Sequence, residues 1–98
     1  MIFKIKKDGT GFSKLLDFGS INASWPIGDL IYDGTYLYGM TWVGGAYGGG
    51  IVFRIKPDGT GFYEIMDFGV NSSGDGGPLG SLISDGTFLY GTKMFRQK

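Results

Sequence analysis

The sequence predicts an all-β fold built from repeated four-stranded antiparallel units. Residues 3–19 (FKIKKDGTGFSKLLDFG) return as residues 53–69 (FRIKPDGTGFYEIMDFG) at an offset of 50 residues. Residues 26–39 (PIGDLIYDGTYLYG) return as residues 78–91 (PLGSLISDGTFLYG) at an offset of 52 residues. A repeat of this length that is rich in short strands indicates propeller blades or another repeat array.

The composition agrees with short strands joined by tight turns. Aromatic residues make up 16% of the chain, and Gly accounts for 20 of its 98 residues against only 3 Pro, as is typical of β proteins with many turns. Apolar residues alternate or form short runs, without the spacing of an amphipathic helix. The longest apolar run is far below the roughly 18 residues that span a bilayer, and Lys4, Lys6 and Lys7 interrupt any secretory signal. We expect neither helices nor a membrane partner.

Each unit is expected to be a meander whose strand order follows from its turns. Asp-Gly turns join the first strand to the second and the third to the fourth, and each Asp-Gly pair is expected to take the positive φ angles of a tight hairpin. A Gly-rich loop over 43–50 joins the second strand to the third, and the link 69–79 is expected to cross to the next blade. In order, the four strands are predicted at 80–84, 88–92, 51–56 and 62–68.

The apolar patterns predict where the strands lie within a blade. In the third strand, Ile51, Phe53 and Ile55 point to one face, and Val52, Arg54 and Lys56 point to the other. The first strand is expected nearest the propeller axis, because Leu30-Ile31 and Leu82-Ile83 are apolar on both faces. The fourth strand is expected to be the most exposed.

The whole chain, 1–98, is expected to be a single two-blade unit whose ends are out of phase with the blades. Residues 1–18 supply the last two strands of a blade, 26–68 a complete blade, and 78–94 the first two strands of another. Closed propellers need about four to eight blades, so two cannot close. We expect residues 2–18 of each chain to complete the blade begun by residues 80–92 of its neighbour in a homo-oligomeric ring. Three chains would give six blades, the favoured count, and four would give eight.

Charge and residue types argue against several functions. Nine basic and nine acidic residues give no net charge, which removes the attraction that nucleic-acid binding needs. The chain has no Cys and no His, which excludes thiolate zinc sites and removes the commonest general base. Calcium needs six to eight converging oxygens, whereas the loop around Asp75 has one carboxylate. We expect no enzyme activity, cofactor, metal or nucleotide.

Two sets of residues admit both a functional and a structural interpretation. Trp25, Trp42 and Tyr47 lie in or beside predicted loops, where aromatic rings either stack on a sugar or fill gaps between blades; packing is favoured. Four carboxylates would resemble a ring of acidic groups, but each precedes a Gly in a predicted turn, and the turn explains them all. These carboxylates are Asp8, Asp33, Asp58 and Asp85.

Residues 37–60 (LYGMTWVGGAYGGGIVFRIKPDGT) resemble the LYGTT-x-x-GG-x-x-G-x-G-TVF-x-x-x-PDGT pattern of the GloVer (Gloeobacter/Verrucomicrobia) tandem repeat. The resemblance implies a bacterial, often exported or surface-anchored protein with β-propeller-like blades and no activity assigned to the repeat. Met40 stands where the family usually has Thr. The second copy leaves the pattern after Thr92.

Function remains open among three hypotheses. The first is a non-catalytic binding or scaffold ring whose loops, rich in aromatics and amides, suit a carbohydrate. The second is a propeller hydrolase, which needs two carboxylates about 5 to 10 Å apart. Asp29 is the only carboxylate expected to face the channel and the second copy has Ser81 there, although symmetry mates of Asp29 could form a site. The third is a fragment that only assembles.

Overall fold

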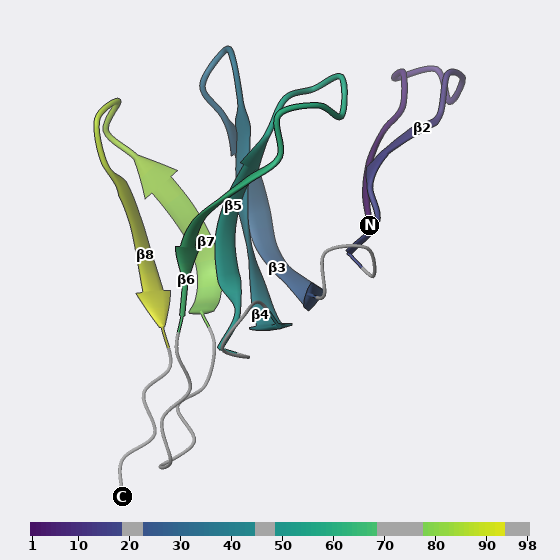
Figure 1. The fold of residues 1–98 in the computed structure, drawn as a ribbon. Helices are drawn as coiled ribbons and strands as arrows, with labels where there is room; N and C mark the ends of the chain where they lie inside the picture. Colours follow the sequence, from purple (N-terminus) through teal and green to yellow (C-terminus); the bar gives the residue numbers. More distant parts are fainter. Residues whose placement is uncertain (19–22, 45–48, 69–77, 94–98) are drawn as a thin grey trace, which may run out of the picture.

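Eight β-strands make up the computed structural model, which describes residues 1–18, 23–44, 49–68 and 78–93 (Figure 1). These residues contain no α-helix, and so none that could cross a bilayer. The all-β prediction is confirmed. The strands are β1 (Ile2–Lys4), β2 (Ser13–Leu16), β3 (Ala23–Tyr32), β4 (Leu37–Gly44), β5 (Ile51–Ile55), β6 (Tyr63–Asp67), β7 (Pro78–Ser84) and β8 (Leu89–Lys93).

The strands form one four-stranded sheet and two separate hairpins, all antiparallel. The sheet has the order β3-β4-β5-β6, so consecutive strands are neighbours and the predicted meander is confirmed. The hairpins are β1-β2 and β7-β8. β3 and β6 are the edges of the meander, and β6 is exposed at four of its five residues.

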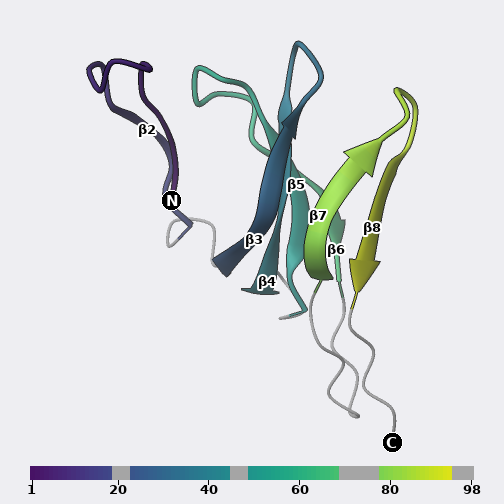
Figure 2. The same cartoon turned by 180° about the vertical axis from the view of Figure 1, so that it is seen from behind.

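The two hairpins lie on opposite sides of the meander, so that three sheets stack in one direction (Figures 1 and 2). The predicted alternation along β5 produces this arrangement, because one set of its side chains faces each hairpin. Ile51, Phe53 and Ile55 join Ile2 and Phe18 in the first core. On the other side, Val52 joins Met40 of β4 and Leu82 of β7 in the second core.

β3 begins at Ala23, five residues before position 28, where the repeat equivalent of the predicted first strand at 80–84 begins. Pro26 and Gly28 fall within β3, although Pro and Gly usually interrupt strands. Pro26 is tolerated here because β3 is an edge strand, where a missing N–H need not break the ladder. It pairs with Thr41 of β4.

Gly28 and its repeat equivalent Gly80 mark the same irregularity in both copies. The pairing of β3 jumps from Ile27↔Met40 to Ile31↔Tyr38, and the pairing of β7 shows the matching jump. Both glycines have positive φ, 72° for Gly28 and 70° for Gly80, which favours Gly at a bulge. A Cβ on Gly28 would overlap the backbone oxygen of Gly80. The two bulges therefore touch, backbone to backbone.

The Asp-Gly turns differ in one respect from the prediction. Only the glycines have positive φ: 88° at Gly9, 97° at Gly34, 86° at Gly59 and 97° at Gly86. Trp25 is the one non-glycine residue with positive φ in the described part of the chain. The expected positive φ at the Asp residues is wrong. Their role is instead to accept hydrogen bonds, since a short carboxylate reaches the backbone N–H groups two and three residues on.

Candidate functional site

Trp25 and Trp42, predicted in or beside loops, lie within β3 and β4. Their rings stack, with centroids 4.8 Å apart and planes 17° from parallel. Trp25 is 62% exposed and has a φ of 59°, a strained value for a bulky residue. The structure therefore brings two of the three predicted ligand residues together, and the third, Tyr47, lies outside the described residues.

The carboxylates of the Asp-Gly turns are engaged in the turns, as predicted. Asp85 Oδ1 accepts hydrogen bonds from the backbone N–H of Phe88 (2.7 Å) and Thr87 (2.9 Å), and its Oδ2 accepts one from the Tyr90 hydroxyl (2.7 Å). The Phe88 N–H, followed by the Tyr90 hydroxyl and the Thr87 N–H, lowers the pKa of Asp85 to about 2. In turn, the Asp85 carboxylate raises the pKa of Tyr90.

The other three turns repeat this chemistry. Asp33 accepts hydrogen bonds from the backbone N–H groups of Thr35 and Tyr36 and from the Tyr38 hydroxyl. Asp8 and Asp58 each accept two bonds from one Thr, through its N–H and its hydroxyl. These bonds lower the pKa of all three carboxyl groups. The turn interpretation is confirmed for the four Asp residues.

Asp29, the one carboxylate expected to face the channel, lies beside its repeat equivalent Ser81. The backbone N–H of Asp29 donates to Oγ of Ser81 at 2.7 Å, so these repeat equivalents are direct neighbours. Within 1–18, 23–44, 49–68 and 78–93, no three His, Cys, Asp or Glu side chains are placed to hold a metal ion. Asp75 lies outside these ranges.

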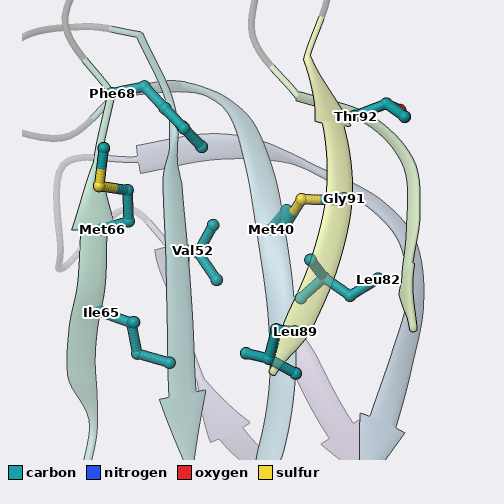
Figure 3. Close-up of a pocket in the computed structure, with 9 residues that line it drawn as sticks. All are labelled: Met40, Val52, Ile65, Met66, Phe68, Leu82, Leu89, Gly91 and Thr92. Atoms are coloured by element: carbon teal, nitrogen blue, oxygen red, sulfur yellow. The ribbon is translucent and has the colours of Figure 1, made fainter. Parts of the chain in front are cut away.

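A large apolar groove opens beside the second core, between β6 and β8 (Figure 3). It encloses about 290 Å³. Ile65 and Met66 of β6 form one wall, and β8 contributes the other. Its nine lining residues are Met40, Val52, Ile65, Met66, Phe68, Leu82, Leu89, Gly91 and Thr92.

The groove corresponds to one side of the first core: it is lined by the repeat equivalents of core residues, without equivalents of the side chains that pack against them. Moving the first-core residues on the β1-β2 side forward by 50 residues, and Leu37 forward by 52, gives positions that all line the groove. In the first core these residues pack with Phe53, Ile55 and Phe62, and with Ile51. The equivalent pairs are Ile2 and Val52, Leu15 and Ile65, Leu16 and Met66, Phe18 and Phe68, and Leu37 and Leu89.

The residues equivalent to that missing filling lie on the β1-β2 hairpin, on the far side of the meander. Phe3 is 52% exposed and Ile5 48% exposed, whereas Phe53 is 1% exposed and Ile55 is fully buried. Phe3 stacks on Phe12 with centroids 5.6 Å apart, just as Phe53 contacts Phe62 at 6.0 Å. The hairpin thus presents a preformed aromatic pair that matches the filling of the first core.

Sequence reasoning expected a neighbouring copy to complete the blades at the two ends of the chain but did not find the groove. Aligning the two copies and asking which apolar positions lack a neighbouring sheet would have indicated it. Such an alignment requires knowing which side of the sheet each apolar side chain faces. For β5, the alternation of apolar residues already predicts this.

The comparisons with known proteins add no relationship. No protein-family model matches the chain, and neither a curated protein nor a solved structure matches it. The resemblance to the GloVer repeat therefore stays a prediction.

Proposed function

We propose that this chain is a non-catalytic scaffold module of the β-propeller type, which assembles with copies of itself into a closed ring. The observation that carries the proposal is the face-to-face stack of hairpin, meander and hairpin, in which equivalent bulges touch at Gly28 and Gly80. Equivalent positions of successive sheets come this close at the inner edges of blades around an axis. β6 lies at the opposite, exposed edge of the meander.

Three copies of the chain would supply six blades, which is the count we favour, and four would supply eight. In this arrangement the β1-β2 hairpin of one copy and the β7-β8 hairpin of the next make one shared blade. Each junction is heterologous, because a different surface of each copy takes part.

The mass of the assembled 98-residue chain tests the proposal. Light scattering and native mass spectrometry over a range of micromolar concentrations are expected to give a fixed multiple of the chain mass, three in the favoured case. Deleting residues 1–18 should abolish that species, whereas removing residues 95–98 should leave it intact. A folded, stable monomer at micromolar concentration would overturn the proposal.

A carbohydrate ligand is a second proposal, favoured by the exposed indole of Trp25 above Trp42. Sugar rings stack on exposed aromatic faces such as this one. A glycan array followed by fluorescence titration tests it, with Trp25→Ala expected to abolish binding. Tyr63→Ala, which removes another exposed aromatic ring, is the matched control. Equal binding by wild type and Trp25→Ala, or none by either, would refute a site at Trp25.

The hydrolase alternative has no comparable observation in its favour. Glycoside hydrolysis needs two carboxylates flanking the scissile bond, and the four turn carboxylates are bonded within their own turns. The absence of enzyme activity stays a prediction, which assays of the assembled ring would test.

A further inference from the structure

We propose that copies of this chain join by strand addition, with β1 of one copy pairing antiparallel to β8 of the next in a defined register. This inference rests on the proposed ring and names its contact. The predicted pairs are Ile5 with Leu89, Lys4 with Tyr90, Phe3 with Gly91, and Ile2 with Thr92. The occupant of the groove is thus a second copy of the chain.

The register comes from the equivalent strands inside the meander. There β4 pairs with β5 through Leu37↔Ile55, Tyr38↔Arg54, Gly39↔Phe53 and Met40↔Val52. β8 repeats β4 at an offset of 52 residues, and β1 repeats β5 at an offset of 50. β1 pairs only with β2, and β8 only with β7, so each has one edge without a strand among the described residues. Such an edge is a template for pairing with another chain.

The same register fills the groove. Phe3 and Ile5 share the face that Phe53 and Ile55 occupy in β5, because side chains alternate along a strand. When β1 lies beside β8, that face turns toward Ile65 and Met66 of the receiving copy, which are 41% and 50% exposed in one chain. The equivalent wall in the first core, Leu15 and Leu16, is packed against its filling.

On the other face of the shared blade, exposed apolar side chains of one copy would meet apolar hollows of the next. Apolar hollows between β1 and the meander are lined by Leu30 and Leu37, among other residues. Ile83 and Tyr90 lie on the β7-β8 hairpin of the neighbouring copy and are 66% and 49% exposed in one chain. They are the repeat equivalents of Ile31 and Tyr38. Those equivalents pack in the second core. One docking event therefore covers exposed apolar side chains on both partners.

A polar contact supports the same register. The guanidinium of Arg54 lies 4.5 Å from the Tyr36 ring centroid and 5.0 Å from that of Tyr63. The repeat places Lys4 at the Arg54 position and Phe88 at the Tyr36 position. Across the proposed junction, the Lys4 ammonium of one copy would lie over the Phe88 ring of the next, a favourable cation–π contact.

Paired cysteines test the register, because the chain has no native Cys. The double variant Lys4→Cys/Tyr90→Cys places thiols on directly opposite residues, whose separation suits a disulfide. Mild oxidation should give a ladder of covalent oligomers that ends at the number of chains in the ring. The control Lys4→Cys/Phe88→Cys moves one thiol two residues back, to the residue just before β8, beyond easy disulfide reach, and should lose the ladder.

The outcomes separate this inference from the proposed ring. An assembled mass with no ladder from the first pair, or with an equal ladder from the control, would overturn the register and leave the ring standing. A monomeric mass for wild type and variants would overturn both. If the cysteine variants fail to fold, hydrogen exchange on the wild-type chain decides: β1 and β8 amides facing the junction should exchange as slowly as those between β4 and β5, and fast exchange would refute the pairing.

Discussion

Phe3 and Phe53 occupy the same position in the two repeats, so replacing each with Ala gives an internally controlled test of the shared blade. Phe53 is buried by the meander and the β1-β2 hairpin of its own chain. Phe3 is 52% exposed in one chain. In the proposed ring it is buried as Phe53 is, so the two substitutions should cost alike.

The loss of unfolding free energy expected for Phe3→Ala is larger if Phe3 is buried between copies than if it stays half exposed in a single chain. Removing a buried Phe side chain costs about 3–5 kcal/mol, because the cavity adds to the lost transfer free energy. Fully burying a Phe side chain is worth about 1.5–3 kcal/mol, so a half-exposed Phe3 would contribute roughly 1 kcal/mol. We expect Phe3→Ala to cost about 3–5 kcal/mol per chain in the assembly and to reduce its mass at low concentration.

Urea denaturation at two protein concentrations, with light scattering at each, measures both effects. Lys7→Ala, an exposed turn residue, serves as the neutral control and should change stability by less than about 0.5 kcal/mol. If Phe3→Ala costs only about 1 kcal/mol and the mass and midpoint do not depend on concentration, the shared-blade reasoning is refuted.

Two further predictions concern the bulges and the turns. Gly28→Ala should prevent stable folding, because its Cβ would overlap the Gly80 backbone, whereas Gly80→Ala finds its nearest atom at 3.9 Å within the chain and carries only the backbone strain of a φ of 70°, about 1–2 kcal/mol. In the proposed ring Gly80 would meet Gly28 of the next copy, so Gly80→Ala should fold but lose assembly by light scattering; full assembly of this variant would contradict the bulge contact. Carboxyl NMR should show Asp85 titrating at about 2. Because its folded pKa is depressed, Asp85 stabilises the β7-β8 hairpin above about pH 4 and loses this effect as pH falls toward 2; Asp85→Asn should flatten this slope, and an unchanged slope would count against the bonding.

Local patterns in the sequence are sufficient to predict the meander and the faces of β5. Alternation assigns Phe53 and Val52 to opposite faces, and the structure places them in different cores. The repeated Asp-Gly pairs predict the turns for the right residues, although Asp33 acts through its carboxylate and not through a positive φ. These features depend on residues close together in the chain.

The features that sequence reasoning missed depend on contacts between distant segments. Pro26 is acceptable in a strand only because β3 is at an edge, and Gly28 is required because Gly80 lies against it. The stacking of Trp25 on Trp42 follows from the early start of β3, which brings these rings onto neighbouring strands. The groove likewise exists only once three sheets have stacked.

A heterologous contact such as the one proposed yields either a closed ring or an open filament, depending on the rotation between successive units. The bulges provide a physical reason for rotation, because Gly28 and Gly80 let the inner edges meet at backbone contact. At the outer edge of the proposed blade, Ile65, Met66 and the aromatic pair Phe3–Phe12 from the next copy's β1-β2 hairpin would stand between the sheets. Sheets that touch at one edge and are held apart at the other form wedges, and wedges close into a ring when their constant angle divides a full turn without a rise along the axis. Light scattering should therefore find one defined size, and a mass that grows continuously with concentration would show that the angle does not close.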